Sequence, residues 1–287
     1  MLIAQITDMH VVPEGELMGQ VVPTNAVLAA AVARINALVP AVDVILATGD
    51  LTEGGSPESY GALRDIVAAA TAPVFLIPGN HDKPDAMRAA FPGHAYLGSG
   101  AFMQYTIEDW PLRLIGLDTR IDQHPGGEIC EARLAWLKTQ LEAQPATPTL
   151  IFMHHPPFRT GIWWMDAIGL RGARDLEDLV RRHDNIEAVV CGHIHRPVTR
   201  RWGGTIATIA PSTAHQMMLD LEGENFLTST KEPPAFLLHH WSDETGLVSH
   251  TVYVDDYGLY DPPDHHDKAM MTQARAFFDK SRDEMGV

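Results

Sequence analysis

The sequence predicts an α/β protein whose core strands pair largely in parallel. Short β-rich runs alternate with amphipathic helical stretches over the first two hundred residues, polar motifs follow directly after those runs, and two hairpin patterns come later in the chain. Alternating strands and helices favour parallel pairing, because each helix carries the chain back to begin the next strand. With 287 residues, the chain has room for one large domain or for a main domain with a smaller appendage.

The first half of the chain is expected to alternate strands with helices from its first residues. Strands are predicted at residues 2–7, 42–48, 74–77 and 113–117. An Ala-rich helix is expected over residues 25–39, with Thr24 as its N-cap. A second helix is expected over residues 57–70, where Ser56 is placed to cap it and Pro57 occupies the first helical position.

The second half continues this alternation and then changes. Strands are predicted at residues 150–153 and 186–190, and helices at residues 131–141 and 175–183. Hairpins are predicted from the strand pairs 198–202 with 205–209, turning at Gly203-Gly204, and 236–241 with 248–254, turning at 243–246. Residues 217–234 show no clear period, residues 256–266 are typical of a linker, and residues 267–282 are expected to form a terminal amphipathic helix.

Composition excludes some partners. The formal net charge of −16 at pH 7 argues against binding to nucleic acid polymers or anionic membranes, since both favour basic protein faces. No apolar stretch approaches the ~20 residues that cross a bilayer, and residues 2–6 are too short for the apolar core of a signal peptide. Cys130 and Cys191 make no disulfide framework, and Cys191 is expected to be a buried small hydrophobic residue. We therefore expect a cytoplasmic protein.

Five short polar motifs, each directly after a predicted strand, carry the functional signal. They are Asp8-Met9-His10, Gly49-Asp50, Gly79-Asn80-His81-Asp82, His154-His155-Pro156-Pro157 and Gly192-His193-Ile194-His195. In open α/β sheets the loops at the carboxyl ends of strands converge on one crevice, so these distant donors are expected to meet. Carboxylate, amide and imidazole donors suit divalent Zn, Mn, Fe or Co. The five motifs together predict a two-metal phosphoesterase site.

The local geometry of these motifs can also be anticipated. Asp8 and His10 are two residues apart, so they would share one face of a strictly extended strand. Gly49, Gly79 and Gly192 precede ligands, and tight turns after a strand often need a residue that tolerates positive φ. A carboxylate at Asp50 is able to bridge two cations held ~3.5–4 Å apart.

In these motifs, residues 1 to about 210 resemble the calcineurin-like metallophosphoesterases, specifically the bacterial class III cyclic-nucleotide and glycerophosphodiester phosphodiesterase group. The resemblance implies a first metal held by Asp8, His10, Asp50 and His195. It implies a second metal held by Asp50, Asn80, His154 and His193. It also implies a four-layer α/β/β/α sandwich, in which two facing sheets are flanked by helices. The expected activity is metal-dependent hydrolysis of small phosphodiesters, such as cAMP or glycerophosphodiesters.

Departures from other branches of the family narrow this expectation. Glu53 stands where purple acid phosphatases carry a tyrosine ligand, so a coloured Fe(III)–tyrosinate centre is not expected. Residues 49–55 lack the arginine with which protein Ser/Thr phosphatases clamp a phosphomonoester, and Asp82 stands where those enzymes have glutamate. Monoester and phosphoprotein substrates are thereby disfavoured.

Two divalent cations and two carboxylates together leave the site with a net positive charge, and the expected mechanism follows from this charge. Coordination lowers the pKa of water towards neutrality, which makes hydroxide available for in-line attack on a phosphodiester monoanion. The catalytic group is expected to comprise Asn80, His81 and Asp82, with His81 stabilising developing charge or protonating the leaving alkoxide and Asp82 orienting its neighbours. Substrate contacts are expected from His10, Asp50, Asn80, His81, His195 and His215.

The remaining histidines are weaker candidates. His155 is expected to be structural, because Pro156-Pro157 directs it away from its neighbour. Surface positions are expected for His94, His124, His183 and His250. The pairs His239-His240 and His265-His266 suggest metal binding by composition alone, and surface or strand positions are the preferred interpretation.

Two rival functions and a domain division complete the expectations. One rival is another hydrolase of this fold, such as a nucleotide-sugar pyrophosphatase or a nuclease, and the other is a metal-depleted scaffold that binds proteins. Residues 1–212 are expected to form the catalytic core, and residues 213–287 a cap with returning strands and a terminal helix. We expect a homodimer, or a multiple of one, formed through residues 215–260. Its interface would use an exposed edge strand at 236–241 and apolar contacts from Met217-Met218 and Phe226.

Overall fold

The computed structural model describes residues 1–258 and 268–285, which fall into two compact units. Residues 1–255 form the first unit and contain both large sheets. The second unit, residues 256–287, contains helix α7 (Lys268–Met285), which confirms the predicted terminal helix. Most of the predicted linker at 256–266, including His265-His266, lies outside the described residues. Over the described ranges, no helix is long and apolar enough to cross a membrane.

The first sheet has the strand order β16-β15-β1-β2-β3. Its strands are β1 (Leu2–Ile6), β2 (Val44–Thr48), β3 (Val74–Ile77), β15 (Ala235–Ser242) and β16 (Gly246–Tyr253). β1, β2 and β3 pair in parallel, as predicted, whereas β15 runs antiparallel to both β1 and β16. Because β15 has partners on both sides, the prediction that residues 236–241 form an exposed edge is wrong. The edge is β16, most of whose side chains are exposed.

The second sheet has the order β11-β12-β10-β8-β5-β4. Its strands are β4 (Tyr105–Ile107), β5 (Arg113–Leu117), β8 (Thr149–Met153), β10 (Ile186–Cys191), β11 (Val198–Trp202) and β12 (Thr205–Ile209). β5, β8, β10 and β12 are parallel, while β4 and β11 close the two edges in antiparallel pairs. The predicted hairpin turn is confirmed, with φ of 59° at Gly203 and 90° at Gly204.

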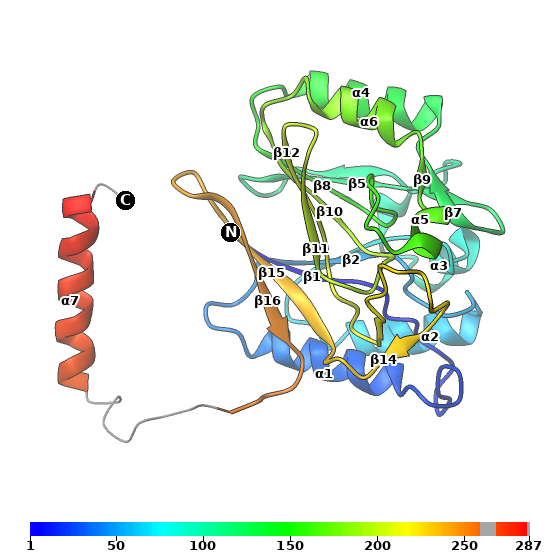
Figure 1. The fold of residues 1–287 in the computed structure, drawn as a ribbon, viewed down its shortest axis with the longest axis horizontal. Helices are drawn as coiled ribbons and strands as arrows, with labels where there is room; N and C mark the ends of the chain where they lie inside the picture. The colour runs from blue at the N-terminus through cyan, green and yellow to red at the C-terminus, as the bar shows by residue number, and fades with distance from the viewer. Residues whose placement is uncertain (259–267, 286–287) are drawn as a thin grey trace. The chain divides into compact units, whose positions relative to one another are not determined.

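The two sheets face each other, and helices cover their outer faces. Side chains from both sheets, among them Leu46 of β2 and Phe152 of β8, form the core between them. Helices α1 (Thr24–Asn36), α2 (Pro57–Val67) and α3 (Pro84–Ala90) pack on the first sheet, and α4 (Glu131–Ala143) and α6 (Ala173–Val180) on the second. Figure 1 shows α4 and α6 above the sheets and α1 and α2 below them. This layering agrees with the sandwich that the resemblance implied.

The two predicted caps have different outcomes. Ser56 caps α2, since its hydroxyl oxygen accepts a hydrogen bond from the Ser59 amide at 3.1 Å. Thr24 does not cap α1, because it is already the first helical residue and Pro23 occupies the cap position. The neighbouring Asn25 side chain instead bonds both backbone groups of Val12, at 3.0 and 2.8 Å, and so ties the start of α1 to the chain after β1.

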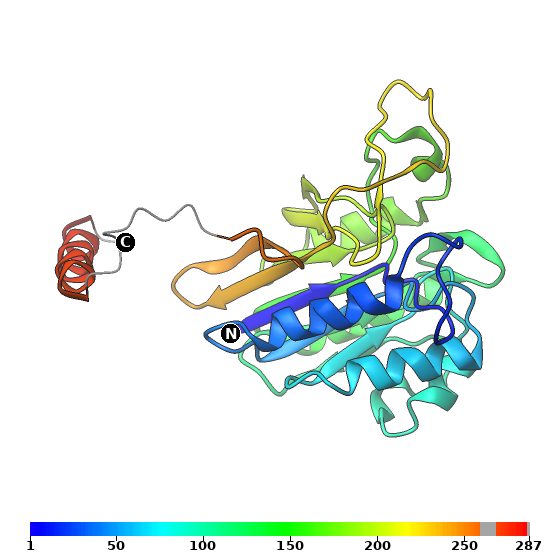
Figure 2. The ribbon, with the colours of Figure 1, turned by 90° about the horizontal axis from the view of Figure 1, so that it is seen from below.

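Several short elements were not predicted. They are α3 and β4, the 3₁₀ turn η1 (Ala95–Leu97), β6 (Arg120–Ile121), β7 (His124–Glu128), α5 (Trp163–Ala167), β9 (Leu170–Arg171), β13 (Gln216–Met217) and β14 (Ser229–Thr230). In Figure 2, α5 and the segment between β13 and β14 project together beyond the sheets. The Phe226 ring lies 6.1 Å from that of Trp163 and 5.6 Å from that of Trp164, so aromatic contacts hold these two loops together.

Candidate metal centre

The predicted ligands meet where the carboxyl ends of strands from both sheets converge. Asp8 and His10 follow β1, Asp50 follows β2, and Asn80 follows β3. From the other sheet, His154 follows β8, and His193 and His195 follow β10. All of these side chains except that of Asn80 are buried, although they are polar or charged. Buried polar groups in such number require partners, whether from the protein or from bound ions.

The backbone at these ligands is turned, not extended. Positive φ angles of 45–73° occur at five of them, Asp8, His10, Asp50, His193 and His195. Left-handed backbone at a residue other than glycine costs on the order of 1 kcal/mol or more, and such strain gathers at functional sites. The prediction that Asp8 and His10 share a face of an extended strand is therefore wrong. β1 ends at Ile6, and the Asp8 and His10 amides each donate at 3.0 Å to carbonyls of the Gly49-Asp50 turn.

The three glycines before ligands serve two different purposes. Gly49 has a φ of 94°, as the turn argument predicted. Gly79 and Gly192 have no such backbone angle, and the prediction is wrong for them. They are needed for close approach, because a Cβ at Gly79 would overlap Asp50 and a Cβ at Gly192 would overlap the Thr7 hydroxyl.

Four donors form a first group, namely Asp8, His10, Asp50 and His195. Their ligand atoms all lie within 4.8 Å of one another. His195 Nε2 is 3.3 Å from Asp8 Oδ1, and His10 Nε2 is 3.7 Å from Asp50 Oδ2 and 3.1 Å from His195 Nε2. The structure thus brings together the set that was expected to hold the first metal.

A second group lies on the other side of Asp50. His154 Nε2 is 3.4 Å from Asp50 Oδ2 and 3.1 Å from Asn80 Oδ1. The rings of His154 and His193 are 5.1 Å apart between centroids. Asp50 Oδ2 thus approaches a histidine of each group, His10 at 3.7 Å and His154 at 3.4 Å.

Each histidine in these groups has one ring nitrogen held by the protein. The Nδ1 atoms of His154 and His195 lie 2.9 Å from the carbonyl oxygens of Thr48 and His215. His10 Nδ1 lies 2.6 Å from the Glu53 carboxylate, and His193 Nε2 lies 3.2 Å from the Ile168 carbonyl. Because these oxygens accept, the held nitrogen carries the hydrogen and the other nitrogen presents a lone pair to the group. Such outer partners are typical of metal-binding histidines.

This arrangement fits cations. With Nδ1 protonated in both rings, His10 Nε2 and His195 Nε2 are two lone pairs only 3.1 Å apart, and His154 Nε2 faces the carbonyl oxygen of Asn80 in the same way. Acceptors repel at that distance unless a proton or a metal ion lies between them. Neither group contains a thiolate, so the donors suit the divalent ions expected from the sequence.

The buried carboxylates and the histidines beside them shift one another's pKa values. Burial opposes charge on His154, yet the carboxylates of Asp50 and Asp8 raise its pKa to about 9. Burial likewise opposes charge on Asp8, but His195 and His154 lower its pKa to about 2. Metal binding must therefore displace protons from these imidazoles.

His81 and Glu53 stand beside the first group. The His81 amide donates to Asp50 Oδ1 at 2.9 Å, and its Nδ1 lies 2.8 Å from the Glu53 carbonyl. His81 Nε2 lies 4.0 Å from Asp50 Oδ2, and the side chain is 36% exposed, so it reaches both the centre and solvent. Burial opposes charge on His81, but Asp50 and the Glu53 carbonyl raise its pKa. Glu53 thus holds one histidine with its side chain and another with its backbone.

The Asp82 side chain does not line the cavity into which the metal ligands open. Its buried carboxylate accepts hydrogen bonds from the backbone amides of Leu51, Thr52 and Gly79 and, at 2.8 Å, from the Tyr60 hydroxyl. These bonds clamp the Asp50 turn to the turn after β3. These bonds occupy the Asp82 carboxylate with protein donors, and its expected part in catalysis stays a prediction.

His215 lies against the first group and is held there by its loop. Its ring centroid is 4.5 Å from that of His195 and 5.6 Å from that of His10. Ser212 anchors the loop, because its hydroxyl donates to the Asp8 carbonyl at 2.8 Å and accepts from the His215 amide at 3.2 Å. Burial and the neighbouring His195 lower the pKa of His215 to about 3, so it is neutral at physiological pH.

The metal groups open into a cavity of about 270 Å³, here called the metal pocket. Its polar floor is formed by His10, Asp50, Glu53, Asn80, His81, His193, His195 and His215. Its walls are apolar and come from Met18, Pro125, Trp164, Met165, Ile168, Met217 and Leu227. No arginine or lysine of the described part of the chain lines it, in agreement with the missing phosphomonoester clamp.

The other histidines separate into three kinds. His155 uses both ring nitrogens, at 2.8 Å from the Thr119 hydroxyl and 3.1 Å from the Pro125 carbonyl, which supports the structural role expected for it. His239 is a fully buried strand residue, and His240 and His250 are exposed. His94, His124 and His183 are half-buried, so their prediction as surface residues is only partly right.

Some contributors to the site were not found from the sequence. Glu53 was noted as a departure from purple acid phosphatases, but its bond to His10 spans 43 residues and leaves no local pattern. The same holds for Ser212 on Asp8, at a separation of 204 residues, and for the Thr48 carbonyl on His154, at 106 residues. Cys191 is fully buried, as expected, and belongs to neither group.

Comparisons with known proteins bear on this site. Residues 1–197 match the family model described as calcineurin-like phosphoesterase. A probable glycerophosphodiester phosphodiesterase of Arcobacter nitrofigilis is 35% identical over 258 residues, which is 90% of this chain and 94% of that protein. A probable cyclic nucleotide phosphodiesterase of Rhodopseudomonas palustris is 37% identical over 234 residues, which is 80% of this chain and 85% of that protein.

A solved structure extends the comparison to the fold. The structure of a dimetal phosphatase from Danio rerio superposes on this protein with a TM-score of 0.65. The superposition covers 88% of this chain and 99% of the chain of the phosphatase. Its sequence identity is 15%, so this similarity concerns the fold alone.

Proposed function

The chain belongs to the calcineurin-like phosphoesterase family and is a metal-dependent phosphodiesterase, and we propose that it hydrolyses small phosphodiesters at a dinuclear centre shared through Asp50. The observation that carries this proposal is the close approach of candidate ligand atoms on both sides of Asp50, at 3.1 Å between His10 Nε2 and His195 Nε2 and at 3.1 Å between His154 Nε2 and Asn80 Oδ1. A metal-depleted scaffold would have no need for seven convergent donors. The same feature therefore argues against the non-catalytic alternative.

The ligand sets follow the two groups. Asp8, His10, Asp50 and His195 would hold one ion, and Asp50, Asn80, His154 and His193 the other. Two bound divalent ions would supply Lewis acidity and lower the pKa of a water molecule at this site. Zn, Mn, Fe and Co all suit the donor set. Asn80 is the only neutral oxygen donor, so the second site should be the weaker of the two.

The protein groups around the ions divide the remaining work. His81 faces both Asp50 and solvent, which places it to stabilise charge on the phosphoryl group or to give a proton to the leaving alkoxide. Asn80 is placed to orient the phosphoryl oxygens, and neutral His215 offers a hydrogen bond at the edge of the floor. Asp82 keeps the turns carrying Asp50 and Asn80 in register.

The walls of the metal pocket favour a substrate with a flat apolar group. Trp164, Met165, Ile168, Met217 and Leu227 offer contacts that a nucleoside base would use and a glycerol group would not. We therefore place 3′,5′-cyclic nucleotides such as cAMP first. Glycerophosphodiesters are the second candidate, because the relative from Arcobacter nitrofigilis carries that activity in its name.

A turnover panel tests the proposal. Metal-free protein would be reloaded with Mn, Co, Zn or Fe and assayed on cyclic nucleotides, glycerophosphodiesters and phosphomonoesters. We expect activity on diesters that disappears with chelation and returns with metal. Full activity in a demonstrably metal-free preparation would sink the dinuclear mechanism, and preference for monoesters would sink the substrate class.

We also propose that residues 213–287, beyond a core of residues 1–212, serve as a cap and a pairing region. The segment between β13 and β14 supplies Met217 and Leu227 to the metal pocket. β16 is the outermost strand of the first sheet among the described residues, and it offers a surface for a second copy together with the exposed side chains of Met218 and Phe226. Light scattering on the intact chain, and on a chain ending near Asp255, tests this homodimer. A monodisperse monomer of the intact chain at micromolar concentration would refute it.

A further inference from the structure

A second cavity lies beside the metal pocket and differs from it in chemistry. It has a volume of about 440 Å³ and is here called the arginine cavity. Met165 lines both cavities, and Ile168 lines the metal pocket while Ala167 and Gly169 line the arginine cavity. The segment that carries α5 therefore forms the wall between them. The metal centre and the proposed mechanism make no use of this second space.

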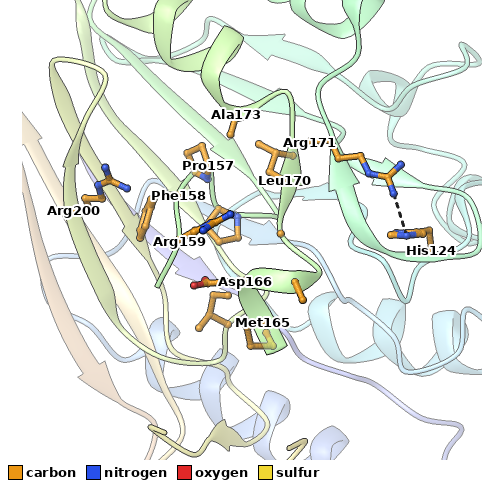
Figure 3. A pocket seen from close by; sticks show the side chains of 14 residues that line it. His124, Pro157, Phe158, Arg159, Met165, Asp166, Leu170, Arg171, Ala173 and Arg200 are labelled. Carbon is orange, nitrogen blue, oxygen red and sulfur yellow. Dashed lines mark hydrogen bonds between the residues drawn. The ribbon is translucent and has the colours of Figure 1, made fainter. Parts of the chain in front are cut away.

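Arginines enter this cavity from three separate elements. Arg159 comes from the loop after β8, Arg171 from β9 and Arg200 from β11. Figure 3 shows Arg159 beside Phe158 in the middle of the cavity, Arg200 at one end, and Arg171 with His124 at the other. Arg171 Nη2 lies 3.5 Å from His124 Nε2. Three cationic side chains from separate structural elements thus share one concave surface.

The protein does not neutralise these charges. Among the described residues, Asp166 is the only carboxylate that lines the cavity, and its oxygens already accept from the Thr160 and Gly161 amides at 2.7 and 3.0 Å. Within the described parts of the chain, the arginine–carboxylate ion pairs involve other arginines, and none includes Arg159, Arg171 or Arg200. A concave surface lined by one sign of charge concentrates ions of the opposite sign. In a chain of net charge −16, this local excess of cations is unlike the average surface.

The rest of the lining is apolar. Phe158, Leu170 and Ile194 present carbon surface among the arginines, and the Arg200 guanidinium lies 5.9 Å from the centroid of the Phe158 ring. Guanidinium groups bind phosphate and carboxylate through paired N–H donors, and apolar walls favour ligands with a carbon portion. A bare inorganic ion would leave that apolar surface unused.

We propose that the arginine cavity binds a small organic anion, in which a phosphate or carboxylate lies beside an apolar group. The site would be separate from the metal centre and would bind its ligand whether or not the ligand is hydrolysed. It goes beyond the phosphodiesterase activity, because it requires neither metal ion.

Titration calorimetry on the full-length, metal-loaded protein at low ionic strength tests this site. Phenylphosphonate and benzoate serve as the two probes, since each joins one anionic group to an apolar ring and neither contains a phosphoester bond. Phenylphosphonate is expected to bind at two sites, one at the metals and one in the arginine cavity. A preference for either probe at the second site identifies phosphate or carboxylate as the natural anion.

Variants locate the binding. Arg159→Ala with Arg200→Ala should weaken the second binding event at least about tenfold, because bonds to charged groups are lost. The control is Arg201→Ala. Arg201 is exposed and follows Arg200 in β11, but its side chain does not line the cavity. Equal binding by the wild type and the double variant would overturn the proposal, and so would an equal loss in the control.

Folding is checked separately through the thermal midpoint and the metal content per chain. If the double variant fails to fold, Arg200→Gln alone supplies the test at the rim of the cavity, and it should weaken the second event several-fold. Unchanged binding in that variant would overturn the proposal. A wild type that binds the probes only at its metals would do the same, without touching the proposed phosphodiesterase function.

Discussion

His154 and His155 are adjacent and equally buried, yet they end in opposite chemical situations. His154 Nδ1 lies 2.9 Å from the Thr48 carbonyl, and its Nε2 faces two candidate ligand oxygens, at 3.1 Å from Asn80 and 3.4 Å from Asp50. His155 has partners for both nitrogens, as does His239 in the interior of the first sheet, where Ser249 and Gln5 lie at 2.7 and 3.1 Å. A buried histidine is thus a candidate ligand when one nitrogen is held and the other is left facing acceptors.

The sharpest way to break this comparison is to remove the shared carboxylate. Asp50→Ala should empty both metal groups, since each depends on this side chain, and turnover should disappear with the metal. The loss should exceed the roughly 10- to 100-fold that removal of an outer partner costs. Metal content and diester turnover measured on the same preparation decide it. Two tightly bound ions in the variant would show that Asp50 does not bridge.

The second prediction tests whether His81 is a metal ligand or a catalytic group beside the ligands. His81→Ala should retain both metals but lower kcat by roughly 10²- to 10⁴-fold, the range for a general acid or base. The reason is that His81 approaches Asp50 no closer than 4.0 Å with its ring, while its backbone amide remains in place. Loss of metal with an unchanged rate per bound ion would show that its role is misassigned.

The third prediction concerns the hydrogen bond between the Glu53 carboxylate and His10 Nδ1. Glu53→Gln should weaken metal binding in the first group by roughly 10- to 100-fold, because a neutral amide orients His10 less strongly than a carboxylate does. Glu58→Gln provides a control, since Glu58 is exposed in the first turn of α2. Titration with a competing chelator measures the affinity. Equal affinities in the two variants would contradict an orienting role for Glu53.

The fourth prediction concerns stability instead of metal binding or rate, at a buried histidine whose two ring nitrogens both have protein partners. Burial lowers the pKa of His239 to about 4 from 6.5. The folded state therefore favours the neutral ring, so this contribution to stability is complete above pH 6.5 and is lost as the pH falls towards 4. The shift corresponds to roughly 3 kcal/mol. Between pH 6.5 and 4, wild-type stability should fall more steeply than that of His239→Gln. Parallel denaturation curves for the two proteins would contradict it.

The same comparison shows what the sequence can and cannot predict. The strands at 74–77, 113–117, 198–202 and 205–209 were predicted with the observed bounds, because turn residues punctuate each apolar run. α5 and β6 were missed because elements of five and two residues are too short for a repeating pattern of apolar residues to be recognised. The position of β15 was also missed, because which strand ends a sheet depends on pairing with β1 across more than 230 residues.

The site divides in the same way. The seven donors could be predicted because each belongs to a short motif after a strand. The left-handed backbone at Asp8 and His10 could not, because it arises from hydrogen bonds to the Gly49-Asp50 turn. Arg159, Arg171 and Arg200 belong to no common sequence motif, so only the fold reveals that they share a cavity.

The spread of the ligands along the chain has a consequence for folding kinetics. Donors from Asp8 to His195 come from both sheets, so the centre closes only after the sheets have docked. Long-range contacts of this kind form late, and interactions absent from the transition state act on the unfolding rate. Bound ions would thus clamp one sheet to the other in the way a cross-link does. Metal loading should slow unfolding strongly and leave the refolding rate nearly unchanged.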